Sequence, residues 1–328
     1  MANILVIGDG AIGLMLSHFL SKAHNVHVLT RKTTANTRFY CKANQPSQKI
    51  NAQFITLKQL NKLPAFDTVI FAVKAFQVID AFIHIKPFLS SRCNIVLSHN
   101  GMGNVEQLNA ELRFEQALYF LTTSMAGFKS NQYIVQHTGE GKNIFGACNT
   151  QAHNNYKAML EQFSALPQLS YSKNIEQLRF EKLLVNIAIN PLSALHNIKN
   201  GQLRAPQFSS TIFNLLTEAC NIAQALKLNI KLADALSNAY TIMTLTAQNY
   251  SSMHQDVIHN RQTEINAICG YISEQGRRLN INTPLNNELL AKIKAKKAWI
   301  KPRFIINLIL RTIYLNARKA FFMQYKRL

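Results

Sequence analysis

A lysine and two asparagines recur at four-residue intervals in an otherwise apolar stretch, at Lys182, Asn186 and Asn190. Residues four apart lie on the same face of a helix, so these three side chains would share one face. A buried ammonium and two buried amides are costly unless they have partners. The pattern indicates either a binding site or a structural polar seam between helices, and it favours neither.

A second set of polar residues lies further along the chain, within 251–278, which we expect to be one long helix. Its members, Ser252, Asp256 and Glu264, have a similar spacing. A lysine on one helix and a glutamate on the next would form a plausible proton-transfer pair. Lys182 and Glu264 are therefore candidates for acid–base chemistry. The alternative is again a structural polar seam.

Three glycines near the start of the chain indicate a phosphate-binding turn. Gly8, Gly10 and Gly13 follow the continuous apolar run 4–7, which is typical of a buried parallel strand, and they precede an expected helix over 11–24. In such a turn the first glycine permits the tight bend, the second lets a pyrophosphate approach the backbone, and the third lets the helix pack closely. The helix N-terminus would favour the phosphate charge. The alternative is an ordinary glycine turn.

The end of the next expected strand, 25–30, bears on the choice of cofactor. NAD-binding chains usually place an acid there to hold the ribose 2′-hydroxyl, whereas this chain has Arg31 and Lys32. A guanidinium binds a 2′-phosphate through two hydrogen bonds, and a carboxylate would repel it. We therefore expect NADP(H), the alternative being a solvated basic pair at a strand end.

Two further strand ends carry polar residues. Lys74 and Gln77 follow the expected strand 67–73, and Asn100 lies in a glycine-rich turn after the strand 94–98. Ligands of open α/β sheets bind outside the carboxyl ends of the strands. These side chains are therefore placed to reach a cofactor, the alternatives being a surface cap and a plain turn.

The elements that must position these residues divide the chain into two parts. Strand and helix patterns alternate through the first half, which predicts an α/β fold with a Rossmann-type doubly wound parallel sheet. The apolar period becomes helical from residue 176 onward, so we place a boundary near 173, between a cofactor-binding domain (1–173) and an all-helical domain (174–328). Further strands are expected at 117–124 and within 133–145, with helices at 75–89 and 105–112 and irregular chain at 33–65, where short strands lie around 51–57. The later helices are expected at 175–190, 191–198, 208–227, 231–248, 251–278, 286–298 and 303–322.

Composition favours a cytoplasmic protein. The chain has 328 residues, five scattered cysteines without metal-ligand spacing, and no signal-type segment at its start. Over half of its net charge of +20 comes from 291–328, which has eleven basic residues and no acid, and this segment ends in a basic, amphipathic C-terminal tail, about 299–328. This tail would either dock on its own domain, which we favour, or lie on an anionic membrane surface. No nucleic-acid module is recognisable and no metal site is expected. A monomer and a homodimer are both compatible with the sequence.

These motifs resemble those of the ketopantoate reductase family, in the family's order across roughly residues 1–290. The matching segments are Gly8-Asp-Gly-Ala-Ile-Gly13, Lys74-Ala-Phe-Gln77, His99-Asn-Gly-Met-Gly103, Lys182-Leu-Leu-Val-Asn-Ile-Ala-Ile-Asn-Pro-Leu192, Asn200-Gly-Gln-Leu203, Ser251-Ser-Met-His-Gln-Asp256 and Arg261-Gln-Thr-Glu-Ile265.

The resemblance implies NADPH-dependent reduction of 2-dehydropantoate to (R)-pantoate, a step of pantothenate and coenzyme A biosynthesis, in a cleft between the two domains. It makes Lys182 the general acid and Glu264 a supporting acid. The implied substrate-binding residues are Asn100, Asn186, Asn190, Asn249 and Ser252. The implied cofactor-binding residues are Gly8, Asp9, Gly10, Ala11, Ile12, Gly13, Arg31, Lys74, Gln77, Asn100 and Glu264.

Two positions depart from the family pattern. Asn266 stands where the family commonly has aspartate, and Cys269 where it commonly has asparagine. They leave open a second possibility, an NADPH-dependent reductase of another branched 2-oxo acid. A third possibility is a catalytically idle NADP-binding adaptor that uses the basic tail, although the intact Lys182 and Glu264 argue against it.

Overall fold

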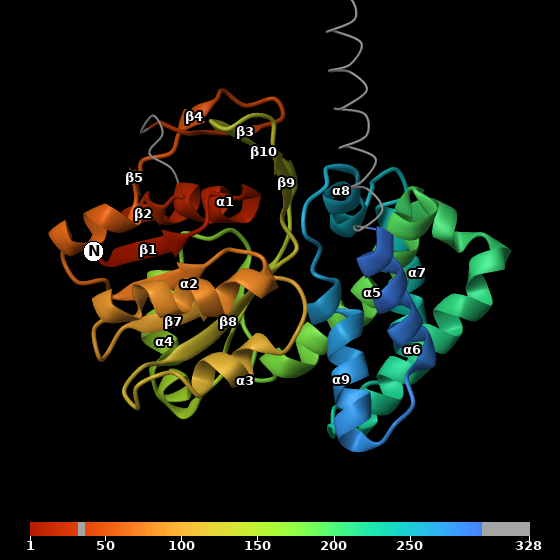
Figure 1. Cartoon of the computed structure of the whole chain (residues 1–328). Coiled ribbons are helices and arrows are strands. Elements are labelled where there is room, and N and C mark those ends of the chain that lie inside the picture. The colour runs from red at the N-terminus through yellow and green to blue at the C-terminus, as the bar shows by residue number, and fades with distance from the viewer. Residues whose placement is uncertain (32–36, 297–328) are drawn as a thin grey trace, which may run out of the picture. The chain divides into compact units, whose positions relative to one another are not determined.

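The computed structural model describes residues 1–31 and 37–296 (Figure 1). The chain divides into two compact units, one formed by Met1–Leu183 and one that begins at Leu184. The division falls inside helix α5 (Ile175–His196), which contributes to both units. The domain boundary near residue 173 stays a prediction. Lys32 and the basic tail lie outside the described residues.

The first unit is built on an eight-stranded sheet with the order β12-β11-β8-β7-β6-β1-β2-β5. Neighbouring strands are parallel except β8 and β11, so the expected Rossmann-type α/β fold is confirmed with one antiparallel pair. Because β1 lies between β2 and β6, the chain switches direction across the sheet at β1, and open α/β sheets bind their ligands outside the carboxyl ends at such a point. The strands are β1 (Asn3–Ile7), β2 (Asn25–Leu29), β5 (Gln53–Ile55), β6 (Thr68–Phe71), β7 (Asn94–Leu97), β8 (Leu118–Thr123), β11 (Asn143–Ala147) and β12 (Leu169–Tyr171).

Helices cover both faces of this sheet, which explains the continuous apolar run in β1. Ile4 and Val6 belong to a core that includes residues of α1 (Ala11–Leu20) and α4 (Thr150–Gln162). Leu5 and Ile7 belong to a second core with residues of α2 (Val78–Ile85) and α3 (Asn104–Asn109). Alternate residues of a strand point to opposite faces, so every residue of the run is buried against a helix layer. Each such side chain contributes about 1.5–3 kcal/mol of apolar burial.

A second sheet was not foreseen from the sequence. Its four strands have the order β4-β3-β10-β9 and comprise β3 (Phe39–Lys42), β4 (Gln48–Lys49), β9 (Ala126–Lys129) and β10 (Ile134–Gly139). The segment 39–49 was expected to be irregular, and this expectation was wrong. These short strands carry many polar residues, so they lack the alternation that identifies a half-buried strand.

The second unit is helical. It contains the rest of α5, α6 (Ser209–Ala225), α7 (Leu232–Leu245), α8 (Ser252–Ile258), α9 (Cys269–Leu279) and a helix over 284–296. The expected break before Pro191 was wrong, because α5 continues through it with buried Ile187 and Leu192 on either side. Apolar packing there outweighs the lost backbone hydrogen bond. Among the residues that the structure describes, no helix is long and apolar enough to cross a membrane.

The expected single helix 251–278 was also wrong. α8 ends through a Schellman motif, in which Asn260 adopts a left-handed conformation (φ 55°) and the backbone N–H of Arg261 donates to the carbonyl of Asp256 at 2.7 Å. Glu264 then precedes a single 3₁₀ turn, Ile265–Ala267, before α9 begins. Glu264 and Ser252 therefore belong to different elements, and the common helical stripe that the spacing suggested does not exist.

Candidate active site

The glycine turn after β1 has the local geometry that a dinucleotide requires. Gly8 has a φ of 108°, and a Cβ there would lie 2.7 Å from the carbonyl oxygen of Ala72. A Cβ on Gly13 would lie 2.1 Å from the carbonyl oxygen of Gly8, so only glycine lets α1 start this close to β1. A Cβ on Gly10, in contrast, would meet nothing within 4 Å. Open space at the middle glycine, at the N-terminus of α1, fits a pyrophosphate held against the backbone.

A lysine that the sequence did not reveal holds this turn in place. Lys129, at the end of β9, donates from its Nζ to the backbone carbonyl of Asp9 at 3.0 Å and pairs with the Asp9 carboxylate at 3.3 Å. The ammonium offsets a carboxylate that would otherwise repel a phosphate in the turn. No sequence signal connects the two residues, because they are far apart in the chain and meet only through the second sheet.

The other expected cofactor residues follow the neighbouring strands of the same sheet. Arg31 is exposed just beyond β2. After β6, the backbone N–H of Lys74 donates to the side-chain oxygen of Gln77 at 3.3 Å, which fixes the start of the short turn that both residues occupy. Asn100 lies after β7 in a turn whose glycines have positive φ angles, 85° at Gly101 and 102° at Gly103. Because the strands are parallel, all of these residues lie at one edge of the sheet.

Lys182 lies at that same edge. Its Nζ donates to the backbone carbonyl of Thr123 at 2.9 Å and approaches the hydroxyl of Thr122 at 3.5 Å, both at the carboxyl end of β8. One turn earlier on α5, the guanidinium of Arg179 lies 3.8 Å from the ring centre of Phe120, so it is packed on the same strand. The structure therefore brings the candidate general acid to the strand edge that carries the glycine turn.

The histidine beside this region is uncharged at neutral pH. Burial lowers the pKa of His99 to about 3, the carbonyl of Asn100 partly opposes this effect, and Arg179 and Lys182 lower the pKa further. An uncharged ring adds no positive charge that would compete with Lys182 for an anion. Lys182 and Arg179 therefore supply the fixed positive charge near the turn that contains Asn100.

In the second unit, the rest of the polar face of α5 carries Asn186 and Asn190. The Nδ2 atom of Asn186 is buried and has no hydrogen-bond partner among the residues that the structure describes. Asn190 is buried, and its backbone carbonyl accepts a hydrogen bond from the hydroxyl of Ser193 at 3.2 Å. A buried amide donor without a partner is costly, and a bound polar ligand would satisfy it.

The remaining candidates lie around the start of α8. The hydroxyls of Ser193 and Ser251 are hydrogen-bonded at 2.7 Å, and Ser251 caps α8 by accepting from the backbone N–H of His254. This link holds the exposed Ser252 near the part of α5 that carries Asn190. Asn249 is exposed in the turn before α8.

Glu264 and Asp256 are buried, whereas Ser252 is exposed. Asp256 forms an ion pair with Arg261 at 3.0 Å, so this ion pair accounts for a buried carboxylate at position 256 and no catalytic role is needed. Of the two departures from the family pattern, Asn266 is exposed, whereas Cys269 is fully buried and burial raises the pKa of its thiol. The pairing of Lys182 with Glu264 stays a prediction.

The Rossmann-type sheet with its glycine turn, followed by a helical unit, defines a dinucleotide-dependent oxidoreductase of two parts. The chain belongs to the ketopantoate reductase family. The family model described as ketopantoate reductase PanE/ApbA matches residues 4–150, and the model of the family's C-terminal part matches residues 174–297. The resemblance noted from the motifs is thus confirmed, and the protein is an oxidoreductase of this type.

Curated relatives agree with this assignment, and solved structures share the fold. The chain is 34% identical to the 2-dehydropantoate 2-reductase of Vibrio cholerae, over 91% of this chain and 99% of that protein. It is 30% identical to the enzyme of the same name from Escherichia coli O157:H7, over 90% and 95%. The structure of a probable 2-dehydropantoate 2-reductase from Bacillus subtilis matches with a TM-score of 0.76 and 26% identity, over 90% and 99%. D-Mandelate dehydrogenase with NADH and anilino(oxo)acetate shares the fold, with a TM-score of 0.85 at 19% identity, over 91% and 99%.

Proposed function

We propose that the protein reduces 2-dehydropantoate to (R)-pantoate with NADPH, as a cytoplasmic step of pantothenate and coenzyme A biosynthesis. The observation that carries the proposal is the position of Lys182, whose ammonium is held by the Thr123 carbonyl at the strand edge that also carries the glycine turn. The 34% identity to a 2-dehydropantoate 2-reductase over nearly the whole of that protein supports the choice of substrate.

Lys182 would act as the general acid. The nicotinamide ring of the bound cofactor supplies the hydride that reduces the ketone carbon. Negative charge then develops on the carbonyl oxygen, and an ammonium beside it stabilises this charge and donates a proton. A carbonyl oxygen only accepts hydrogen bonds, so Thr123 orients the ammonium without competing for its charge. Glu264 would support this step as a second acid.

The substrate's polar groups would be bound by the amides of α5 and the start of α8. The unpartnered Nδ2 donor of Asn186 suits a hydroxyl or carboxylate oxygen. Asn190, Asn249 and Ser252 would complete this set, together with Asn100 from the first unit. Because Ser193 fixes the start of α8 against α5, Asn190 and Ser252 would be held near one another before the substrate arrives.

The preference for NADP(H) rests on Arg31. Its exposed side chain follows β2, where a 2′-phosphate of the cofactor would lie, and no acid stands between Asn25 and Arg31 to hold a free ribose hydroxyl. Gly8, Asp9, Gly10, Ala11, Ile12 and Gly13 would hold the pyrophosphate, and Lys74 and Gln77 would contact the cofactor beyond it.

The test is oxidation of NADPH by the purified full-length protein, followed by absorbance, with 2-dehydropantoate, with a panel of other branched 2-oxo acids, and with NADH in place of NADPH. We expect turnover to be fastest with 2-dehydropantoate and NADPH. Faster turnover of another 2-oxo acid would refute the substrate, and equal use of NADH would refute the cofactor preference. NADPH binding without any turnover would favour the idle adaptor instead.

A further inference from the structure

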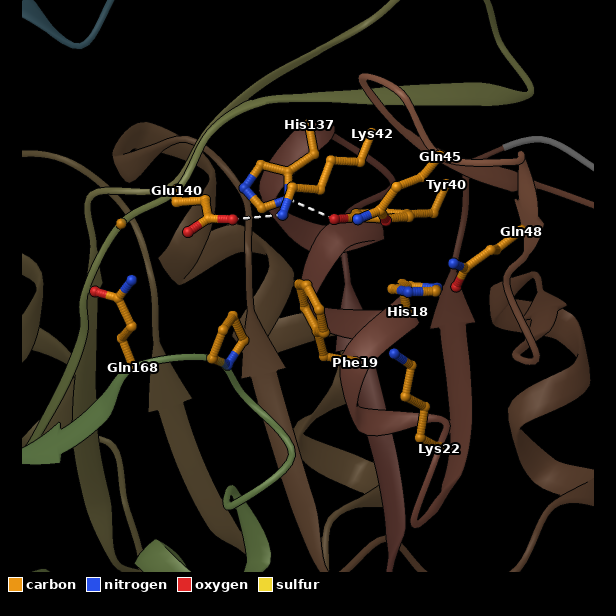
Figure 2. A pocket seen from close by; sticks show the side chains of 12 residues that line it. His18, Phe19, Lys22, Tyr40, Lys42, Gln45, Gln48, His137, Glu140 and Gln168 are labelled. Carbon is orange, nitrogen blue, oxygen red and sulfur yellow. Dashed lines mark hydrogen bonds and ion pairs between the residues drawn. The ribbon is translucent and has the colours of Figure 1, made fainter.

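A cavity lies in the first unit, at the end of α1 that is remote from the glycine turn (Figure 2). Its volume is about 170 Å³, and it lies between α1 and the strands β3 and β10 of the second sheet. We call it the α1 pocket. It shares no residue with the candidate active site, and the function proposed above gives it no role.

One wall of the α1 pocket is aromatic and rigid. The rings of His18 and Tyr40 are stacked, with centroids 4.0 Å apart and planes 2° from parallel, and Phe19 meets Tyr40 edge-on at 5.6 Å. The Tyr40 hydroxyl and Nδ1 of His137 are 2.5 Å apart, and Nε2 of His137 lies 2.9 Å from the carbonyl of Gly139. A carbonyl only accepts, so Nε2 donates to it. Such a wall loses little entropy when a flat ring packs against it.

The pocket also has one positive charge that no acid balances. Two lysines line it, and Lys42 is paired with Glu140. Lys22 lies 5.3 Å from the ring centre of Phe19 and forms no ion pair with any residue in 1–31 or 37–296. Burial, together with the charge of Lys22, lowers the pKa of His18 to about 4, so this ring is uncharged at neutral pH.

Three amide side chains complete the lining, from Gln45, Gln48 and Gln168. Figure 2 shows Gln48 beside His18 and Gln168 on the far side of Phe19, so donors and acceptors flank the aromatic wall. Amides bind carboxylate oxygens through their N–H groups without adding charge. With neutral amides as the other polar groups, the single unbalanced ammonium supplies one positive charge, which one carboxylate balances.

We propose that the α1 pocket binds a small aromatic carboxylate, whose ring packs on the wall formed by Phe19 and Tyr40 and whose carboxylate pairs with Lys22. The cavity volume limits the ligand to about one ring and its acid group. The α1 pocket is separate from the strand edge that carries Lys182, so a ligand bound there would not take part in the reduction. The proposal therefore does not depend on which substrate the protein reduces.

The test uses benzoate as a probe, titrated into the full-length protein and followed by ligand-observed NMR. We expect saturation with a dissociation constant on the order of 1 mM or tighter, as suits a ligand of this size. Benzamide, which has the same shape without the charge, and cyclohexanecarboxylate, which has the charge without the flat ring, should each bind several-fold more weakly. Equal binding of all three would overturn the proposal.

Two lysine variants test whether benzoate binds in the α1 pocket. Lys22→Met keeps the length of the side chain and removes its charge, and we expect it to weaken benzoate binding roughly tenfold, the value of one charge-assisted hydrogen bond. Lys157→Met, which changes an exposed lysine of α4 outside the pocket, is the matched control and should leave binding unchanged. Unchanged binding in Lys22→Met, or loss of benzoate when 2-dehydropantoate and NADP⁺ are added in excess, would place the probe elsewhere and refute the proposal.

Discussion

Removal of Lys129 should weaken NADPH binding through the charge of Asp9. Lys129→Met deletes the ammonium that pairs with the Asp9 carboxylate at 3.3 Å and supports the backbone carbonyl of Asp9 at 3.0 Å. Two effects then oppose a pyrophosphate in the turn, since an attractive charge is lost and a carboxylate is left unbalanced beside the phosphates. Both act in the same direction.

The size of the effect follows from the exposure of the pair. The Lys129 and Asp9 side chains are 28% and 40% exposed, so water screens their charges, and the attraction between the lost ammonium and a nearby phosphate is worth at most about 1 kcal/mol. The unbalanced carboxylate facing the cofactor adds a similar amount, about 1 kcal/mol at an effective dielectric near that of water. Together they predict NADPH binding that is weaker by roughly tenfold to thirtyfold.

The assay is a titration of NADPH followed by its fluorescence on binding, which needs no turnover. Asp9→Asn removes the unbalanced charge, so the double variant Lys129→Met with Asp9→Asn should recover most of the lost affinity, to within about fivefold of the wild type. The reasoning is refuted if Lys129→Met binds NADPH as the wild type does, or if the loss is as large in the Asp9→Asn background.

Other predictions concern catalysis, cofactor choice and stability. Lys182→Met should lower kcat by about 10²-fold or more while NADPH binding persists, and near-normal turnover would remove the residue from the mechanism. Arg31→Ala should raise the dissociation constant for NADPH far more than that for NADH, and equal losses would contradict a 2′-phosphate contact. Asn260→Ala should destabilise the protein by about 1 kcal/mol, because alanine resists the left-handed conformation that ends α8, whereas Asn260→Gly should not; thermal unfolding of both variants checks this. The folded protein holds His18 with a pKa lowered from 6.5 to about 4, so the unfolded chain binds the extra proton first and stability should fall as the pH drops through this interval. Denaturant unfolding at several pH values should show a smaller fall for His18→Gln, and an identical fall would contradict the assignment.

The sequence predicted best those features whose causes are local. Each of the three glycines in the turn is needed for a local reason. Gly8 has a positive φ, Gly10 has open space where a Cβ would be, and Gly13 packs too closely for a side chain. The buried run of β1 was equally clear, because both faces of a parallel sheet need apolar residues.

Some features that escaped prediction depend on residues far apart in the chain, and one is local. Lys129 meets Asp9 only because β9 joins the second sheet, whose short polar strands have no recognisable period. The end of α8 at Asn260 is a local signal that was overlooked, since asparagine commonly occupies the left-handed position of a Schellman motif. The apolar period continued on both sides of this break and hid it.

The continuity of α5 has consequences for the polar residues that the sequence singled out. Pro191 removes one backbone donor, but it follows Asn190 and so does not interrupt the four-residue spacing from Lys182 onward. Had the helix ended before Pro191, Ser193 would not be one turn from Asn190 on the same helix, where its hydroxyl bonds both the Asn190 carbonyl and Ser251. The buried residues around the proline therefore do more than fill the core, because they keep α5 helical as far as the serine that fixes the start of α8 and, with it, Ser252.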